Sequence, residues 1–150
     1  MKYAIPLELV ELEENNYHLA VKSRFDDGSE RLWVIDSGAS KTVFNIALDN
    51  YYDLIPENEE QIIRSAGIGS DQLDMALGFL HSFYLGDLLL PRMKAALIDL
   101  SHINTLYYDA TKREICGLIG SDFLQENKAI VDYGKLRLTL TVRKRKRQLF

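Results

Sequence analysis

The residues with the clearest potential for chemistry lie in the segment LWVIDSGASKTVF, where Asp36 ends an apolar run. Ser37, Gly38, Ala39 and Ser40 follow the aspartate directly. A carboxylate that leaves a buried strand can act as a general base toward a water molecule when a second group supplies a proton. The same residues also suit an ordinary turn, because serine and glycine are common in turns. Both interpretations remain open on this segment alone.

Other kinds of catalytic site are excluded by the residues that they need. The histidines His18, His81 and His102 are scattered, and the chain contains neither HExxH nor CxxC, so no zinc ligand pair is recognisable. The single cysteine, Cys116, lies in the apolar run ICGLIG, where we expect a buried and unreactive thiol. The GxSxG, Walker A and GxGxxG motifs are absent. We therefore expect no metal and no cofactor.

The elements that must position Asp36 are predicted from alternating apolar and polar residues, which are typical of half-buried strands. Such alternation covers residues 3–12, 17–25 and 30–36, with the polar segments ENN and DDG between them. We expect a three-strand meander that ends at Asp36.

The remainder of the chain is predicted to be mostly strands with short helices. The expected order is a short helix or irregular loop over 45–55, two or three strands within 60–90, a strand over 91–100, a helical part of 101–114 capped by Ser101, a buried strand from Cys116, a short helix from Ser121 or Asp122, and a closing hairpin turned at Asp132–Gly134. This order predicts a mainly β chain.

Length and composition indicate one globular domain. The chain has 150 residues, of which 47% are hydrophobic and 27% charged, as in ordinary globular proteins. We expect one domain over residues 1–142 and a basic tail over 143–150. No apolar run approaches the roughly 20 residues of a membrane-spanning helix, and acidic residues stand where a signal peptide would continue its apolar stretch. With one cysteine, these features predict a cytoplasmic protein without a membrane partner.

The basic residues are concentrated in the run RKRKR, residues 143–147. It holds five of the 18 basic residues, so the rest of the chain has 13 basic against 22 acidic residues, a net charge of −9. No aromatic residue is interleaved with the run, and an acidic body repels a phosphate backbone. We expect a solvated tail and no nucleic-acid partner.

Three segments together resemble the aspartic protease family. VIDSGAS, with Asp36 after two apolar residues, resembles the active-site signature Asp-Ser/Thr-Gly-Ala/Ser. GLIGSDFL, residues 117–124, resembles the later apolar-apolar-Gly segment, and SAGIGSDQ, residues 65–72, lies where a glycine-rich flap would be. Their order and spacing are similar to the single-domain, retropepsin-like branch, and the resemblance covers roughly residues 32–140.

The resemblance implies a mainly β fold, namely a closed retropepsin-like acid-protease barrel with one or two short helices. It also implies an aspartic endopeptidase in which two carboxyls share one proton and activate a water. The chain has one Asp-Ser-Gly, because DDGSE at 26–30 lacks the preceding apolar pair. The second carboxylate would then be Asp36 of another copy, in a homodimer that cleaves a peptide or protein substrate.

The same resemblance implies roles for residues around Asp36. Ser37 would reach across the dimer axis, Gly38 would offer its N–H to the carboxylate, and Ala39 would lack the hydroxyl found in the pepsin-like branch. Gly67, Ile68 and Gly69 would form the substrate-binding flap. Gly120 and Asp122 would be structural, with Asp122 as a helix cap rather than a second catalytic acid.

Two departures from the family leave a second hypothesis open. The basic C-terminus RKRKRQLF would repel its copy if the tails met at a twofold axis. The polar residues SDQ also follow Gly69. The alternative is therefore a non-catalytic retropepsin-like module that binds a peptide or partner through the same groove.

Overall fold

A computed structural model describes residues 1–56 and 76–143. The expected flap, Gly67, Ile68 and Gly69, and the basic tail beyond Arg143 lie outside the described residues. The strands are β1 (Lys2–Pro6), β2 (Glu8–Glu13), β3 (Asn16–Phe25), β4 (Glu30–Ile35), β5 (Val43–Asn45), β6 (Tyr52–Ile55), β7 (Ala76–Leu80), β8 (Phe83–Leu85), β9 (Leu88–Leu90), β10 (Met93–Ile98), β11 (Ile115–Ile119), β12 (Ile130–Asp132) and β13 (Arg137–Thr141). The helices are the 3-10 helix η1 (Asp49–Tyr51), α2 (Ser101–Thr111) and α3 (Ser121–Glu126).

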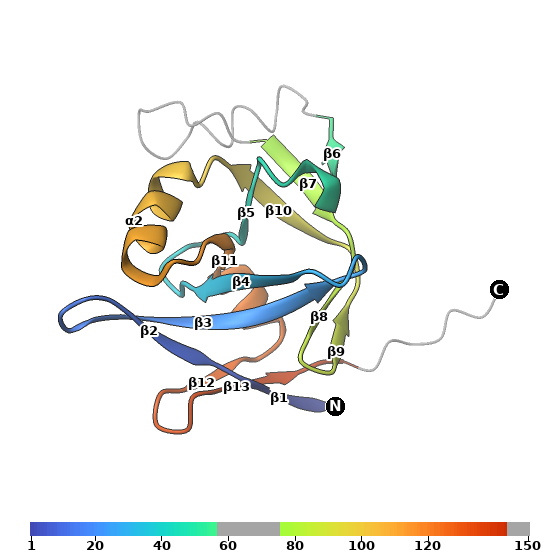
Figure 1. The fold of residues 1–150 in the computed structure, drawn as a ribbon. Helices are drawn as coiled ribbons and strands as arrows, with labels where there is room; N and C mark the ends of the chain where they lie inside the picture. The colour runs from blue at the N-terminus through green and yellow to red at the C-terminus, as the bar shows by residue number, and fades with distance from the viewer. Residues whose placement is uncertain (57–75, 144–150) are drawn as a thin grey trace.

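Most strands form one large curled sheet (Figure 1). Its hydrogen-bonded order is β6-β7-β10-β5-β11-β4-β3-β8-β9, and β2 pairs with β3. A second sheet has the order β1-β13-β12 and brings the first and last strands together. The predicted mainly β architecture is confirmed, with the large sheet curled into a half-barrel.

The meander that leads to Asp36 is confirmed for β2, β3 and β4, which pair antiparallel in sequence order. The prediction of one strand over residues 3–12 is wrong, because the chain changes sheets at Pro6 and Leu7. Proline has no N–H for a ladder, and the next N–H, that of Leu7, donates to the Leu136 carbonyl at 2.9 Å. β1 thus pairs with β13 instead of continuing into β2.

Two helical predictions are confirmed in position, and one capping detail is corrected. The segment over 45–55, expected to be a short helix or loop, contains η1 but ends in strand β6. Helix α2 lies within the predicted range and α3 begins at the predicted Ser121. Ser101 is not the cap of α2, since the N-cap residue is Leu100. The Asp99 carboxylate accepts a hydrogen bond from the Ser101 N–H at 2.9 Å instead. No helix of the described ranges is long and apolar enough to cross a membrane.

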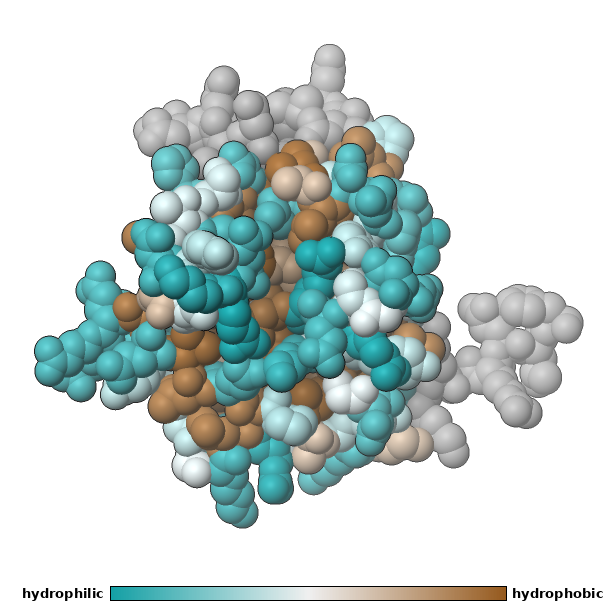
Figure 2. Space-filling view, viewed as in Figure 1, coloured by the Kyte–Doolittle hydropathy of each residue, from teal (hydrophilic) through white to brown (hydrophobic). Residues whose placement is uncertain are grey.

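Apolar residues pack on both faces of β4, which leads to the Asp36 loop. Trp33 lies in the main core, where its ring stacks on Phe83 with centroids 5.4 Å apart. On the opposite face, Leu32 and Val34 pack with Tyr107 of α2. Burial on both sides explains the unbroken apolar run before Asp36 in the sequence. The molecular surface is largely polar on the side shown in Figure 2, with apolar residues showing along its middle and at its lower left.

Candidate active site

Asp36 stands directly after β4, at the end that points toward α2 in Figure 1. Its N–H donates to the Ile119 carbonyl at 2.9 Å, which extends the parallel pairing of β4 with β11 by one residue. Its Oδ1 accepts the Gly38 N–H at 3.1 Å, and its carbonyl accepts the Ala39 N–H at 3.1 Å. The turn therefore holds a half-buried carboxylate at the strand end.

The second family-like segment packs against this turn through two glycines. The Ser121 N–H donates to the Ala39 carbonyl at 2.7 Å. A Cβ on Gly120 would lie 2.6 Å from the carbonyl of Lys41, and a Cβ on Gly117 would lie 2.3 Å from the Val43 carbonyl oxygen. Both glycines are thus required by close backbone approach, which brings residues 117–121 against the Asp36 loop.

Asp122 binds Thr42, at the C-terminal end of the Asp36 loop, and does not act as the predicted N-cap. The N-cap of α3 is Gly120, with no side-chain capping bond. Asp122 lies in the first turn, where its Oδ1 accepts from the Phe123 N–H at 2.8 Å and from the Thr42 hydroxyl at 2.8 Å. Its Oδ2 accepts from the Thr42 N–H at 3.1 Å. Both carboxylate oxygens are engaged, so Asp122 is a structural residue, as expected.

Thr42 is a residue that sequence reasoning missed. It is buried, and its hydroxyl both donates to Asp122 and accepts from the Gly120 N–H at 3.2 Å. It connects the end of the Asp36 loop to the start of α3. Because the partners are about 80 positions apart in the sequence, nothing near Thr42 indicates the contact.

The remaining predicted loop residues differ in exposure. Ser37, Gly38 and Ser40 are exposed, and Ala39 is half-buried. The structure thus places the whole of Asp36–Ser40 at one strand end. The flap residues Gly67, Ile68 and Gly69 cannot be placed beside them, because they lie outside the described residues.

His18 and Tyr107 also lie near the site, and sequence reasoning missed both. The Tyr107 hydroxyl hydrogen-bonds to Nδ1 of His18, and the two rings have centroids 5.8 Å apart. Burial, and next the negative charge of Asp36, raise the pKa of Tyr107 to about 12. Tyr107 therefore stays protonated at neutral pH. The pair depends on α2 packing against the β2–β3 hairpin, a contact that local patterns do not reveal.

A metal-based alternative has no ligand set in the part of the chain that the structure describes. No group of three or more His, Cys, Asp or Glu side chains there is arranged to hold an ion. Cys116 is a free, buried cysteine, and burial raises the pKa of its thiol. The expectation of an unreactive thiol agrees with this environment.

A scan against protein-family models gives no match, and neither does a comparison with curated proteins. Among solved structures, a retropepsin-like aspartic protease from Rickettsia conorii is 16% identical, with 93% of this chain and 90% of that chain covered and a TM-score of 0.45. The retroviral protease-like domain of Ddi1 from Leishmania major is also 16% identical, with coverages of 82% and 89% and a TM-score of 0.49.

A third solved structure, edgp, is 10% identical with a TM-score of 0.55, and the match covers 93% of this chain and 46% of edgp. Identities this low concern the fold alone, and activity has to be argued from the site. Two of these three structures are described as retropepsin-like or retroviral protease-like, the kind of protein that the segments around Asp36 and Gly120 and residues 65–72 resemble in sequence.

Proposed function

We propose that the chain is an aspartic endopeptidase that works as a homodimer, with Asp36 of each subunit in one active site. The observation that carries the proposal is the Asp36 turn: a half-buried carboxylate at the end of a strand, oriented by the Gly38 N–H at 3.1 Å. A fixed, partly solvated carboxylate suits a base that must activate water.

One carboxylate is insufficient for this chemistry. In the proposed reaction one carboxylate takes a proton from the water, while the protonated one donates to the carbonyl oxygen of the peptide bond. Two carboxyls about 3 Å apart share one proton because like charges at that distance cannot both ionise. The chain has one Asp-Ser-Gly, and Asp122 is engaged with Thr42. The second carboxylate therefore comes from a second copy across a twofold axis.

The other loop residues take supporting roles in this proposal. Ser37 is exposed, which leaves its hydroxyl available to the partner subunit. Gly67, Ile68 and Gly69 would close over the substrate and exclude water. The substrate is an extended peptide or protein segment that pairs with strand edges beside Asp36. The reaction needs no cofactor.

Cleavage of a mixed peptide library from acidic to neutral pH tests the catalytic role. Asp36→Asn is nearly isosteric and cannot accept the proton, so cleavage should be abolished while thermal unfolding stays that of the wild type. Asp26→Asn, in the exposed DDG turn, is a matched control that should cleave normally. Cleavage by Asp36→Asn near the wild-type rate would contradict the assignment.

Assembly is the second test. Activity per chain should fall on dilution as dimers dissociate. Analytical ultracentrifugation of the full chain and of a chain without residues 143–150, at two salt concentrations, reports whether the basic tails oppose association. If they do, truncation or added salt should strengthen the dimer.

The alternative is a non-catalytic module that binds a peptide or partner in the same groove. One observation favours it: β1 is already paired with β13 of its own chain over five residue pairs, so these strands do not need a partner's strands to complete their pairing. A strict monomer at high concentration, with or without peptide, would leave Asp36 without its partner and favour this second function.

A further inference from the structure

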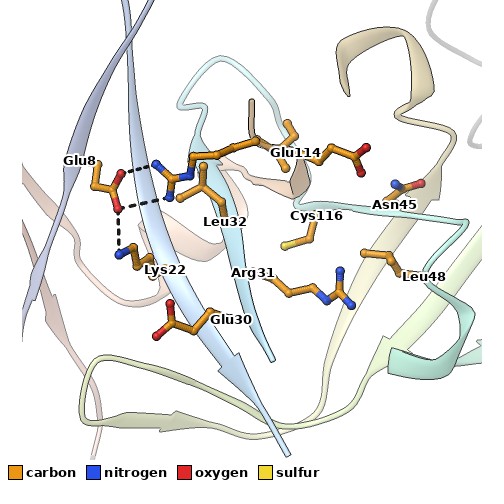
Figure 3. A pocket seen from close by; sticks show the side chains of 11 residues that line it. Glu8, Lys22, Glu30, Arg31, Leu32, Asn45, Leu48, Glu114 and Cys116 are labelled. Atoms are coloured by element: carbon orange, nitrogen blue, oxygen red, sulfur yellow. Dashed lines mark hydrogen bonds and ion pairs between the residues drawn. The ribbon is translucent and has the colours of Figure 1, made fainter. Parts of the chain in front are cut away.

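A cleft of about 600 Å³ opens at the start of β4, opposite to the end that carries Asp36. Figure 3 shows its lining side chains, which come from β2, β3, β4, β5 and β11 and the segments beside them. Arg31 and Asp36 are five residues apart on a strand, and at about 3.3 Å per residue that places them roughly 16 Å apart. The cleft is therefore a separate site and does not rest on the proposed peptidase activity.

Arg31 is the best-oriented charged group of the cleft. Its guanidinium lies over the Tyr51 ring, 4.6 Å from the centroid, and its Nη2 donates to the Tyr51 hydroxyl at 2.8 Å. The Tyr51 hydroxyl in turn donates to Oδ2 of Asp27 at 2.6 Å. This chain of contacts fixes the plane of the guanidinium before any ligand arrives.

The same guanidinium has an unused donor. Arg31 Nε is buried and has no hydrogen-bond partner among the described residues. No carboxylate of these residues lies within ion-pair distance of Arg31 either. Arginine N–H groups form strong, charge-assisted hydrogen bonds with carboxylates, so the unused Nε–H of Arg31 is a donor suited to a ligand carboxylate.

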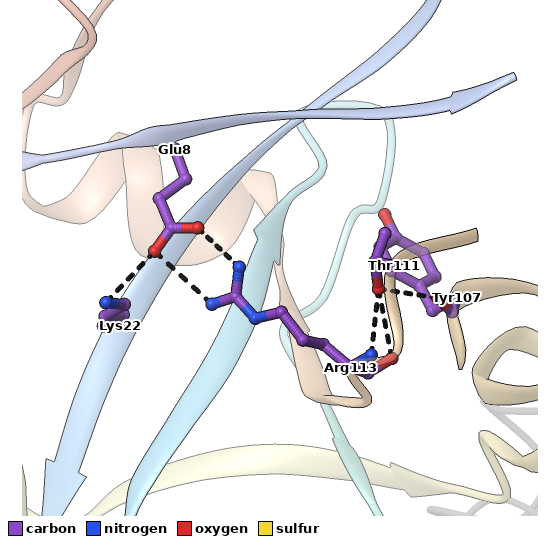
Figure 4. Close-up of polar contacts among 5 residues, drawn as sticks. All are labelled: Glu8, Lys22, Tyr107, Thr111 and Arg113. Atoms are coloured by element: carbon purple, nitrogen blue, oxygen red, sulfur yellow. Dashed lines mark hydrogen bonds and ion pairs between the residues drawn. The ribbon is translucent and has the colours of Figure 1, made fainter. Parts of the chain in front are cut away.

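The opposite wall carries the other two cations of the cleft, whose three positive charges equal its three carboxylates. Glu8 accepts from Arg113 Nη1 at 2.6 Å and pairs with Lys22 at 3.3 Å, so two cations share one carboxylate (Figure 4). The hydrogen bond from Arg113 is the main reason that the pKa of Glu8 is lowered. The arginine is itself held, since its backbone N–H donates to the Thr111 hydroxyl at 3.1 Å.

The remaining lining residues favour a small ligand whose part away from the carboxylate is apolar. Leu32 and Ile115 are buried in the wall, and Leu48 lies beside the Arg31 guanidinium in Figure 3. Glu30 and Glu114 are exposed rim residues and oppose a free anion. A ligand with a single carboxylate and an apolar remainder places its charge on Arg31 and its carbon atoms on the leucines, away from the rim.

We propose that this cleft is a binding site for a small apolar carboxylate, whose carboxylate accepts a hydrogen bond from Arg31 on one wall and faces Lys22 and Arg113 on the other. Such a group is present both in free N-acylated amino acids and at the C-terminus of a peptide with an apolar last residue. The shared chemistry is the carboxylate next to an apolar side chain.

The test compares probes that differ only in charge, by NMR titration of the full chain. N-acetyl-leucine should shift the amide resonances of Leu32, Asn45 and Ile115, whereas N-acetyl-leucinamide should bind at least tenfold more weakly. A leucine-ended tripeptide with a free carboxylate, against its amide, distinguishes a peptide C-terminus from a free small acid by relative affinity. Equal binding of acid and amide, or no shift with any acid up to its solubility limit, would overturn the proposal.

Variants then assign the effect to Arg31. Arg31→Lys keeps the charge and loses the fork, so the affinity for N-acetyl-leucine should fall at least tenfold. Arg24→Lys is the matched control, because Arg24 lies over Tyr84 and does not line the cleft. Glu114→Gln should bind a few-fold more tightly, and Asp36→Asn should bind as the wild type. Unchanged affinity in a folded Arg31→Lys protein would contradict the site, and the acid–amide comparison decides if that variant does not fold.

Discussion

The two ends of β4 carry charged groups that are held in different ways. At the Asp36 end, most of the contacts are made by the backbone. The N–H groups of Gly38 and Ser121 donate hydrogen bonds to the loop. Gly117 and Gly120 allow close backbone contact. At the Arg31 end, long side chains from several elements hold one another. Close backbone contacts tolerate few substitutions, whereas the fold should lose little stability when one partly exposed side chain changes.

The largest effect is expected at the Asp36 end, from Gly117→Ala. The added Cβ would lie 2.3 Å from the Val43 carbonyl oxygen and 2.6 Å from the Trp33 ring, so backbone must move. We expect a loss of about 3 kcal/mol or more in the free energy of unfolding, as for severe overpacking. Urea denaturation measures the loss.

Gly134→Ala is the control for Gly117→Ala. Its Cβ would meet only the Asp132 carboxylate, at 3.4 Å, and its φ is not in the left-handed region. Stability should be unchanged or slightly raised. Equal losses in the two variants would mean that close approach does not explain Gly117.

A smaller loss is expected from Thr42→Val. The substitution removes the hydroxyl that donates to Asp122 and leaves the buried Gly120 N–H without its partner. An unpaired buried donor costs about 1–3 kcal/mol. Thr105→Val, which loses only an exposed bond to the Ser101 carbonyl within α2, is the matched control. If the two variants unfold at the same urea concentration, the hydrogen bonds of the Thr42 hydroxyl do not stabilise the contact between the Asp36 loop and α3.

The contrast between the two ends also explains what the sequence could predict. The Asp36 loop was predictable because its residues are contiguous, its glycines mark close approach, and an unbroken apolar strand precedes it. The change of sheet at Leu7, the Thr42–Asp122 contact, and the His18–Tyr107 and Arg31–Tyr51 pairs were not. They depend on side chains that meet only after distant elements pack, and no local period records such a meeting.

Ala39→Ser tests the Asp36 end by the pH dependence of cleavage, not by the stability of the fold. If position 39 faces the carboxylate, the new hydroxyl donates to the ionised form and favours it. The acidic limb of the pH–cleavage profile should then move to lower pH, by about half a unit to one unit for one hydrogen bond. Ser40→Ala, at an exposed position, should leave the limb in place. An upward shift in Ala39→Ser would show that this side chain does not reach Asp36.

The smallest effect is expected at the other end of β4, from Glu8→Gln. The pKa of Glu8 is lowered from 4.5 mainly by the hydrogen bond from Arg113, so the ionised carboxylate stabilises the fold. That contribution is present above about pH 4.5, the value in the unfolded chain, and is lost as the pH falls through the lowered value in the folded chain. Because the Glu8 side chain is 35% exposed, water screens the pair, and Glu8→Gln should cost less than about 1 kcal/mol at pH 7.

The difference between wild type and Glu8→Gln should shrink toward zero when urea denaturation is repeated at pH values below the lowered pKa of Glu8 in the folded chain, since the wild-type carboxylate is then protonated too. Glu14→Gln, at an exposed position in the β2–β3 turn, gives the background for loss of one negative charge. A Glu8 effect that stays constant from pH 7 to pH 3 would assign the loss to packing rather than to charge. If Glu8→Gln lowered the free energy of unfolding as much as Thr42→Val does, the contrast between the two ends would disappear. The side-chain pairs at the Arg31 end would then contribute as much stability as the buried contacts at the Asp36 end.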